Sequence, residues 1–185
     1  QQSGLVLALA GAGDQYAFKH ALVRDAAYDG LLHRVRRQLH GRIVEALETV
    51  FPSIIASNPE LAAQHSTEAR LYEKAVRYWL AAGRLAVARS AHSEAASDLE
   101  RALQCLRRLP DNAVWAAKRL ECLVTLGPSL ILIEGPGAQR VEVVYSDAVQ
   151  LCERVEPGLD HVAAFWGWWR ISQAPRASQL RATPR

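Results

Sequence analysis

Histidine and glutamate side chains one helical turn apart can hold a zinc ion or exchange protons, and His65 and Glu68 have that spacing. They do not complete the HExxH pattern of zinc proteases. His65 falls on an apolar stripe, so we expect a core histidine rather than a metal ligand. The carboxylates of Glu94 and Asp98 are also one turn apart, and we expect them on the solvated face of a helix.

The three cysteines show no metal-binding or disulfide pattern. They are Cys105, Cys122 and Cys152, an odd number without CxxC spacing. We expect them to be small apolar residues on helices in a reducing compartment. The sequence therefore predicts no metal site.

Phosphate-binding loops need glycines followed by Lys and Ser or Thr, and this chain has no GxxxxGKS or GxxxxGKT. Gly11–Asp14 and Gly135–Gly137 are glycine-rich but lack the Lys. No serine lies in the strand-turn-helix pattern of a hydrolase nucleophile. We therefore expect a chain without catalytic residues or a cofactor of its own.

A group of arginines near residue 40 could contact phosphates. The group comprises Arg34, Arg36, Arg37 and Arg42. They share a predicted helix with the stripe Val35, Leu39 and Ile43, so we interpret them as its solvated side. The formal net charge of the chain is only +3. We do not expect nucleic acid to be the partner.

The overall composition is that of a folded protein in the cytoplasm. Half of the residues are hydrophobic, yet no apolar run is long enough to span a bilayer. Leu5–Ala10 is too short, and lacks the basic flank, for a signal peptide. The chain begins at Gln1 and has no Met, so we expect further sequence upstream.

Apolar spacing predicts helices along most of the chain, separated by Pro- and Gly-containing breaks. Tyr16–Phe18 alternates as a short strand does. The predicted helices cover residues 21–32, 35–51, from about 58 to 72, 73–89, 93–109, 114–133, 139–155 and 159–171, with Pro52 ending the second. We predict an all-α array of helical hairpins with a short β element at the N-terminus.

One helix pair resembles the tetratricopeptide repeat, in which small residues at fixed places let two helices approach closely. The matching residues are Trp79, Ala82, Gly83, Ala95, Leu99 and Ala102. A second, weaker match to the repeat pattern places Ala148 at the position that Ala102 has in the first unit. An ordinary helical bundle with alanine-rich seams remains the alternative.

Several short motifs, in order, resemble the end of the winged-helix region and the following repeats of bacterial STAND-class ATPases. They are Tyr16–Tyr28, Arg37–His40, Ala46–Glu48, Pro59–Ala62, His65, Glu73–Ala75 and Gly83. The resemblance covers roughly residues 14–170. It is strongest to proteins in which a class III adenylate or guanylate cyclase precedes an AAA-like ATPase and helical repeats. It implies that ATP or ADP binds in an upstream domain.

In some relatives of this class, the histidine of a Met-His-Asp motif touches the phosphates of bound ADP. His20 takes that place, although Lys19 stands for the Met and Ala21 for the Asp. The resemblance therefore implies a nucleotide-sensing role for His20 in the parent protein. Local hydrogen bonding at the end of a strand is the alternative.

These patterns divide the chain into five parts. Residues 1–33 end a winged-helix-like region, 34–72 are connecting helices, 73–156 are tetratricopeptide-like repeats, 157–171 begin a further repeat, and 172–185 form a disordered tail. Trp166, Trp168 and Trp169 are expected to be the core of that further repeat, left half exposed. The loss of pattern after Ile171 suggests an early stop or a frame change in the gene.

We predict a non-catalytic regulatory or protein-interaction segment of a multidomain signalling ATPase, with a possible link to an adenylate or guanylate cyclase. Its partner would be a protein, a peptide or the ATPase core of the parent itself. Two alternatives stay open: a segment of a STAND-type transcription activator and a stand-alone repeat scaffold. The sequence leaves the oligomeric state open.

Overall fold

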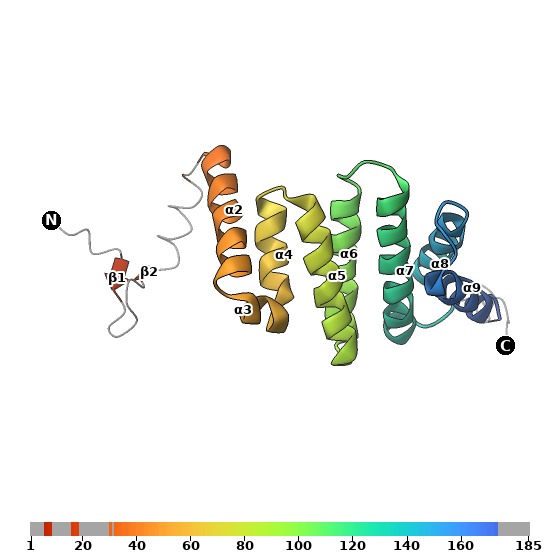
Figure 1. Cartoon of the computed structure of the whole chain (residues 1–185). Coiled ribbons are helices and arrows are strands. Elements are labelled where there is room, and N and C mark those ends of the chain that lie inside the picture. Colours follow the sequence, from red (N-terminus) through yellow and green to blue (C-terminus); the bar gives the residue numbers. More distant parts are fainter. Residues whose placement is uncertain (1–5, 9–15, 19–29, 31, 174–185) are drawn as a thin grey trace.

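The helices of the chain stack one after another into an elongated array (Figure 1). The computed structural model describes residues 6–8, 16–18, 30 and 32–173. The helices are α2 (His33–Thr49), α3 (Pro52–Ser57), α4 (Pro59–Glu68), α5 (Tyr72–Ala88), α6 (His92–Leu106), α7 (Ala113–Glu134), α8 (Gln139–Cys152) and α9 (Leu159–Ser172). The predicted all-α array is confirmed.

Two short strands precede the helices. β1 (Val6–Ala8) pairs antiparallel with β2 (Tyr16–Phe18), and Leu7 lies opposite Ala17. The predicted strand at Tyr16–Phe18 is confirmed. The predicted helix over residues 21–32 and the tail from residue 174 lie outside the described residues.

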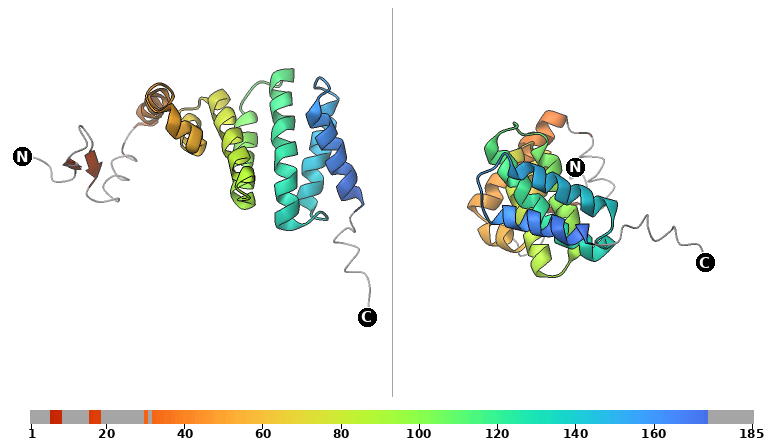
Figure 2. Two further views of the ribbon diagram at one scale, coloured as in Figure 1. Left: turned by 60° about the horizontal axis from the view of Figure 1, so that its bottom comes forward. Right: turned by 90° about the vertical axis from the view of Figure 1, so that its right-hand side faces the viewer.

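Each helix from α4 to α9 packs chiefly on the helices next to it in the chain, as the turned views also show (Figure 2). Two identical turns set this arrangement, one before α5 and one before α6. Arg70 and Ser90 adopt left-handed backbones with φ of 59° and 58°. The amide of the next residue then bonds back into the preceding helix, Leu71 N to Ser66 O and Ala91 N to Ala86 O. None of the described helices is long and apolar enough to cross a membrane.

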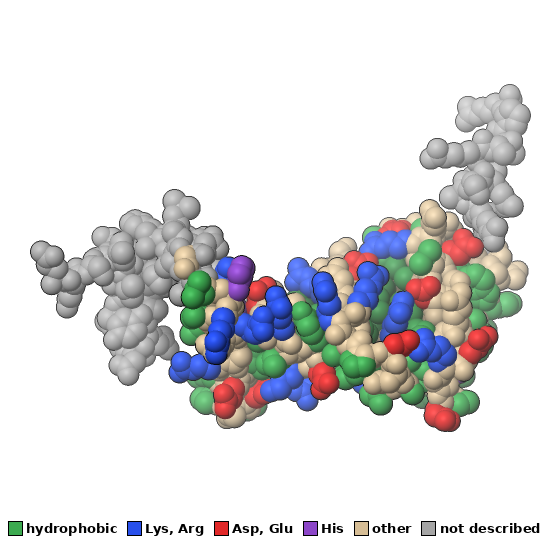
Figure 3. Space-filling view, turned by 90° about the horizontal axis from the view of Figure 1, so that it is seen from above, with side chains coloured by type: hydrophobic (Ala, Val, Ile, Leu, Met, Phe, Trp, Pro, Cys, Tyr) green, Lys and Arg blue, Asp and Glu red, His purple; other side chains and the backbone are tan. Residues whose placement is uncertain are grey.

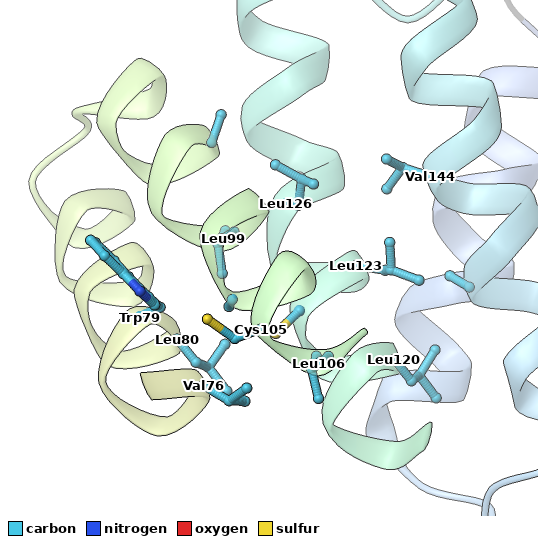
Figure 4. Packing of buried hydrophobic residues seen from close by; sticks show 14 of the residues in the cluster. Val76, Trp79, Leu80, Leu99, Cys105, Leu106, Leu120, Leu123, Leu126 and Val144 are labelled. Atoms are coloured by element: carbon cyan, nitrogen blue, oxygen red, sulfur yellow. The ribbon is translucent and has the colours of Figure 1, made fainter. Parts of the chain in front are cut away.

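The centre of the array is the contact between α5 and α6. A Cβ at Gly83 would lie 2.6 Å from Cγ of Leu99, so the absence of a side chain allows the two helices to approach. Val76 and Leu80 of α5 and Leu106 of α6 continue this core, and Leu120, Leu123 and Leu126 of α7 extend it on the other side of α6, while Trp79 lies on the side of α5 away from α7 (Figure 4).

Tyr145 of α8 fills the junction with α7 and α9. Its ring lies where a side chain on Gly127 or Gly167 would be, and only 3% of the residue is exposed. These two glycines therefore hold the last three helices together, although the sequence analysis gave neither of them a role.

The predicted helix ends before Pro52, at Thr49, as expected, but Pro52 also begins the unpredicted helix α3, where its missing N–H costs nothing. One expectation for the first helices was wrong. The stripe Val35, Leu39 and Ile43 of α2 does not face the core, since each of these side chains is at least 36% exposed. Val44 and Leu47 make the buried contact of α2 instead.

A polar cluster fixes α2 to α5. Glu48 accepts hydrogen bonds from Lys74 Nζ at 2.5 Å and from the Tyr78 hydroxyl at 2.6 Å, and Arg77 lies at 3.3 Å. Burial opposes ionisation of Glu48, but these donors outweigh it and lower the pKa of the carboxyl. The cluster compensates for the small apolar contact of α2.

Replacing Gly167 with alanine tests the Tyr145 junction. The new methyl group would overlap the buried Tyr145 ring, so we expect Gly167→Ala to lower the free energy of unfolding by about 1–3 kcal/mol. Gly41→Ala in α2 is the control, because no atom lies within 4 Å of its Cβ position. It should raise stability by up to about 1 kcal/mol through helix propensity. Urea unfolding measures both, and a neutral Gly167→Ala would contradict the packing described.

Candidate functional site

One long face of the array carries a hollow with a strongly basic lining over its first helices. It has a volume of ≈ 1110 Å³ and is bounded by α2, α4, the start of α5 and the end of α6. We call it the basic groove, after its six arginines Arg36, Arg37, Arg70, Arg101, Arg107 and Arg108. Figure 3 looks onto this face and shows Lys and Arg side chains gathered over the first helices, with a histidine beside them.

The floor of the groove is a set of contacts around one threonine. Thr67 Oγ1 of α4 accepts the indole N–H of Trp79 at 3.0 Å and donates to the carbonyl of Ala63 at 2.8 Å. Its Oγ1 also lies 3.7 Å from Sγ of Cys105. Thr67 thereby joins α4, α5 and α6, and the floor is continuous with the core.

Five of the six groove arginines have no ion-paired acid among the described residues, although Arg101 is close enough to Asp98 to act on its pKa. Arg37, Arg70, Arg101, Arg107 and Arg108 are exposed, and none of them forms an ion pair within the described part of the chain. Among the lining residues that the structure describes, Glu68 is the only carboxylate. The groove is thus a concentration of positive charge on a chain of small net charge.

Arg101 has a second contact, to the floor itself. Its guanidinium carbon lies 4.8 Å from the centroid of the Trp79 ring, a cation–π geometry. Trp79 is only 2% exposed, so the arginine covers the remaining face of the ring. This contact orients one of the cations of the groove.

Two histidines meet at the side of the groove formed by α2 and α4. Nδ1 of His40 lies 2.7 Å from Nδ1 of His65, so one ring donates and the other accepts. Burial and the neighbouring His40 lower the pKa of His65, while Glu68 partly opposes the shift. The prediction that His65 lies in the core was wrong, because His65 is half-buried and lines the groove.

The groups with the largest pKa shifts lie outside the groove. Burial, with Glu94 and Glu60 nearby, raises the pKa of Asp98 to about 6, against the opposing effect of Arg101. Burial raises the pKa of the Cys122 thiol to about 12. Asp98 is 7% exposed, so its expected place on a solvated face was wrong. These groups are dispersed and do not form a nucleophile and base pair.

The residues matched to the repeat pattern are buried in the helix contacts. Trp79, Ala82, Gly83, Ala95, Leu99, Ala102 and Ala148 all lie in the interior. His20, the residue with the proposed nucleotide role, lies outside the described residues. Cys105 and Cys122 are buried, whereas Cys152 is half-buried.

The aromatic residues of α9 lie partly on the surface. Trp166 and Trp169 are 63% and 53% exposed, with ring centroids 5.0 Å apart, while Trp168 packs against the core. The expectation of a half-exposed cluster at this helix agrees with the structure.

The sequence analysis missed most of the basic groove. It noted Arg36 and Arg37 as a solvated face, but gave no role to Arg70, Arg101 or the pair Arg107–Arg108. The sequence feature that could have indicated the groove is the pair Arg107–Arg108 at the end of a predicted helix, just before the break at Pro110. Nothing in the linear pattern joins these positions, because the fold brings four separate segments together.

Comparison with known proteins gives one distant relative. An uncharacterized protein of Rhizobium meliloti (strain 1021) is 31% identical over 169 residues, which are 90% of this chain and 16% of that protein. The chain thus matches a small part of a much longer protein. No protein-family model matches the chain. No solved structure matches it either.

The raised pKa of Asp98 predicts how stability depends on pH. The folded state binds the Asp98 proton more tightly than the unfolded chain, so its ionisation destabilises the fold as pH rises from 3.8 through about 6. Asp98→Asn removes this ionisation, so its effect on the free energy of unfolding should depend on pH. We expect the substitution to be more stabilising at pH 8 than at pH 4, by roughly 1–3 kcal/mol.

The matched control is Glu45→Gln, which removes the same charge from an exposed position of α2. Urea unfolding at both pH values measures the two variants. An equal response of Asp98→Asn and Glu45→Gln would show that the burial of Asp98 has no energetic consequence.

Proposed function

We propose that the chain is a non-catalytic regulatory and protein-interaction segment of a multidomain signalling ATPase. The observation that carries the proposal is the basic groove, a hollow whose floor is part of the helix packing and whose rim is exposed and charged. Helical arrays offer such extended concave surfaces to partners.

Two further observations support a place within a larger protein. The similar segment in Rhizobium meliloti belongs to a chain of which it is 16%. The motifs that resemble STAND-class ATPases run through α2, α4 and α5 in the order that the resemblance requires. The cyclase link and the cytoplasmic setting follow from that resemblance and form part of the proposal.

The position of the groove offers a route to regulation. It is bounded by α2 and α4 of the connecting helices and by α6 of the repeats, so a bound partner would contact both parts. α2 directly follows the segment proposed to end the winged-helix region. A partner that binds one arrangement of α2 and α6 more tightly than another would shift the equilibrium of the attached ATPase.

The test begins with the DNA that flanks this coding segment and then uses the full-length protein that it encodes. We expect a phosphate-binding loop in frame upstream. We expect the double variant Arg107→Glu, Arg108→Glu to change ATP hydrolysis roughly fivefold or more, a typical size for coupling between sites. Steady-state phosphate release measures this rate.

Arg89→Glu is the matched control, since Arg89 is exposed and lies outside the groove. It should leave the rate of ATP hydrolysis unchanged. Absence of a phosphate-binding loop in frame, or equal rates for the groove variant and the wild type, would contradict the proposed function.

A further inference from the structure

We infer that the basic groove binds an acidic protein segment, that is, a stretch of chain rich in Asp and Glu. The inference rests on the proposed function, because it takes the groove as the interaction site and names the chemistry of its partner. The first argument is charge complementarity between this surface and a run of carboxylates.

The cations of the groove differ from many cations elsewhere in the array. Arg84, Arg140 and Arg154 each have a carboxylate partner within the fold. The five exposed groove arginines named above have none in the described part of the chain. Several like charges held together without counterions repel one another, and a ligand with several carboxylates would remove that repulsion.

The position of α2 adds to this effect. The first turn of α2 contains no acidic residue and Leu32 provides no side-chain cap, so neither balances the positive end of the helix dipole. Arg36 and Arg37 are close to this end and line the groove. Carboxylates bound here would interact favourably with both the arginines and the helix terminus.

Arginine is suited to this ligand in particular. Its planar guanidinium can donate two parallel hydrogen bonds to one carboxylate, and Arg101 is already oriented by its stacking on Trp79. The volume of ≈ 1110 Å³ exceeds the usual range for small-molecule sites, which is about 300–1,000 Å³. A peptide segment fits these dimensions better than a single ion.

Two other occupants fit less well. Single-stranded nucleic acid needs exposed aromatic rings on which bases can stack. In the groove, Trp79 is buried under Arg101 and Tyr72 is half-buried. The end of this chain, residues 174–185, contains three Arg and no Asp or Glu, so the groove would repel it.

The test measures binding of a fluorescein-labelled oligoglutamate peptide to the full chain by fluorescence anisotropy. An oligoglutamine peptide of equal length and an oligothymidylate of equal charge are the comparison probes. We expect saturable binding of oligoglutamate only. The double variant Arg107→Glu, Arg108→Glu should weaken it about tenfold or more, and Arg89→Glu should change it by less than about twofold.

Arg70 allows a second test that does not depend on charge reversal. Arg70→Gly and Ser90→Gly each relieve a left-handed residue in the same kind of turn, so both should raise the midpoint of thermal unfolding. Only Arg70→Gly removes a cation of the groove. We expect it to weaken oligoglutamate binding about threefold, with Ser90→Gly unchanged.

The inference is overturned if oligoglutamine binds as tightly as oligoglutamate, or if both arginine variants bind oligoglutamate like the wild type. Tighter binding of oligothymidylate than of oligoglutamate would also overturn it, in favour of a nucleic-acid partner. The assay contains no ATPase domain. Loss of the ATPase effect with intact oligoglutamate binding would therefore refute the proposed function and leave this inference standing.

Discussion

The contact of Gly83 with Leu99 sets the distance between α5 and α6, and much of the structure depends on that distance. With a side chain at position 83, Leu99 could not lie where it does, 2.6 Å from the place of a Cβ. On the same helix as Gly83, Trp79 is enclosed between Arg101 of α6, which lies over its ring, and Thr67 of α4, which accepts its indole N–H. The floor of the basic groove is therefore continuous with the packing of these helices.

The positive charges on the rim of the groove have a different physical origin from the contacts of its floor. Arg70 follows the end of α4, and Arg107 and Arg108 follow the end of α6, where positive side chains interact well with the helix dipole. This accounts for part of the positive charge without any ligand. It does not account for Arg37, near the positive end of α2, or for Arg101, inside α6. The excess of cations beyond what the helix termini favour is the reason for assigning the groove to a partner.

The sequence predicted the helices well where one pattern sufficed to define them. The spacing of apolar residues and the breaks at Pro110 and Gly135 located α5 to α9, and Trp79 with Gly83 indicated the close helix pair. Helix α3 was missed because a proline can follow the end of one helix and begin the next within a few residues. The stripe of α2 was misjudged because periodicity shows that a helix has an apolar face, but not that a neighbour covers it.

The groove could not be predicted in the same way, because its residues come from segments that only the fold brings together. The same is true of Asp98, whose spacing from Glu94 is typical of a solvated face, although packing of α6 buries it. Local patterns therefore predict elements, whereas charge and burial at a site depend on contacts between elements distant in sequence. Tyr145 is a further case, since its place between Gly127 and Gly167 involves three helices at once.

The attachment of α2 connects this packing to the proposed regulation. α2 buries two apolar side chains and is also held by the cluster of Glu48 with Lys74 and Tyr78, at the opposite end of the helix from the groove. At the groove itself, His40 of α2 bonds to His65 of α4. A ligand that bridges Arg37 and Arg107 would add an attachment between α2 and α6, and would further restrict the helix. In the proposed parent protein, such a restriction would act directly on the segment that precedes α2.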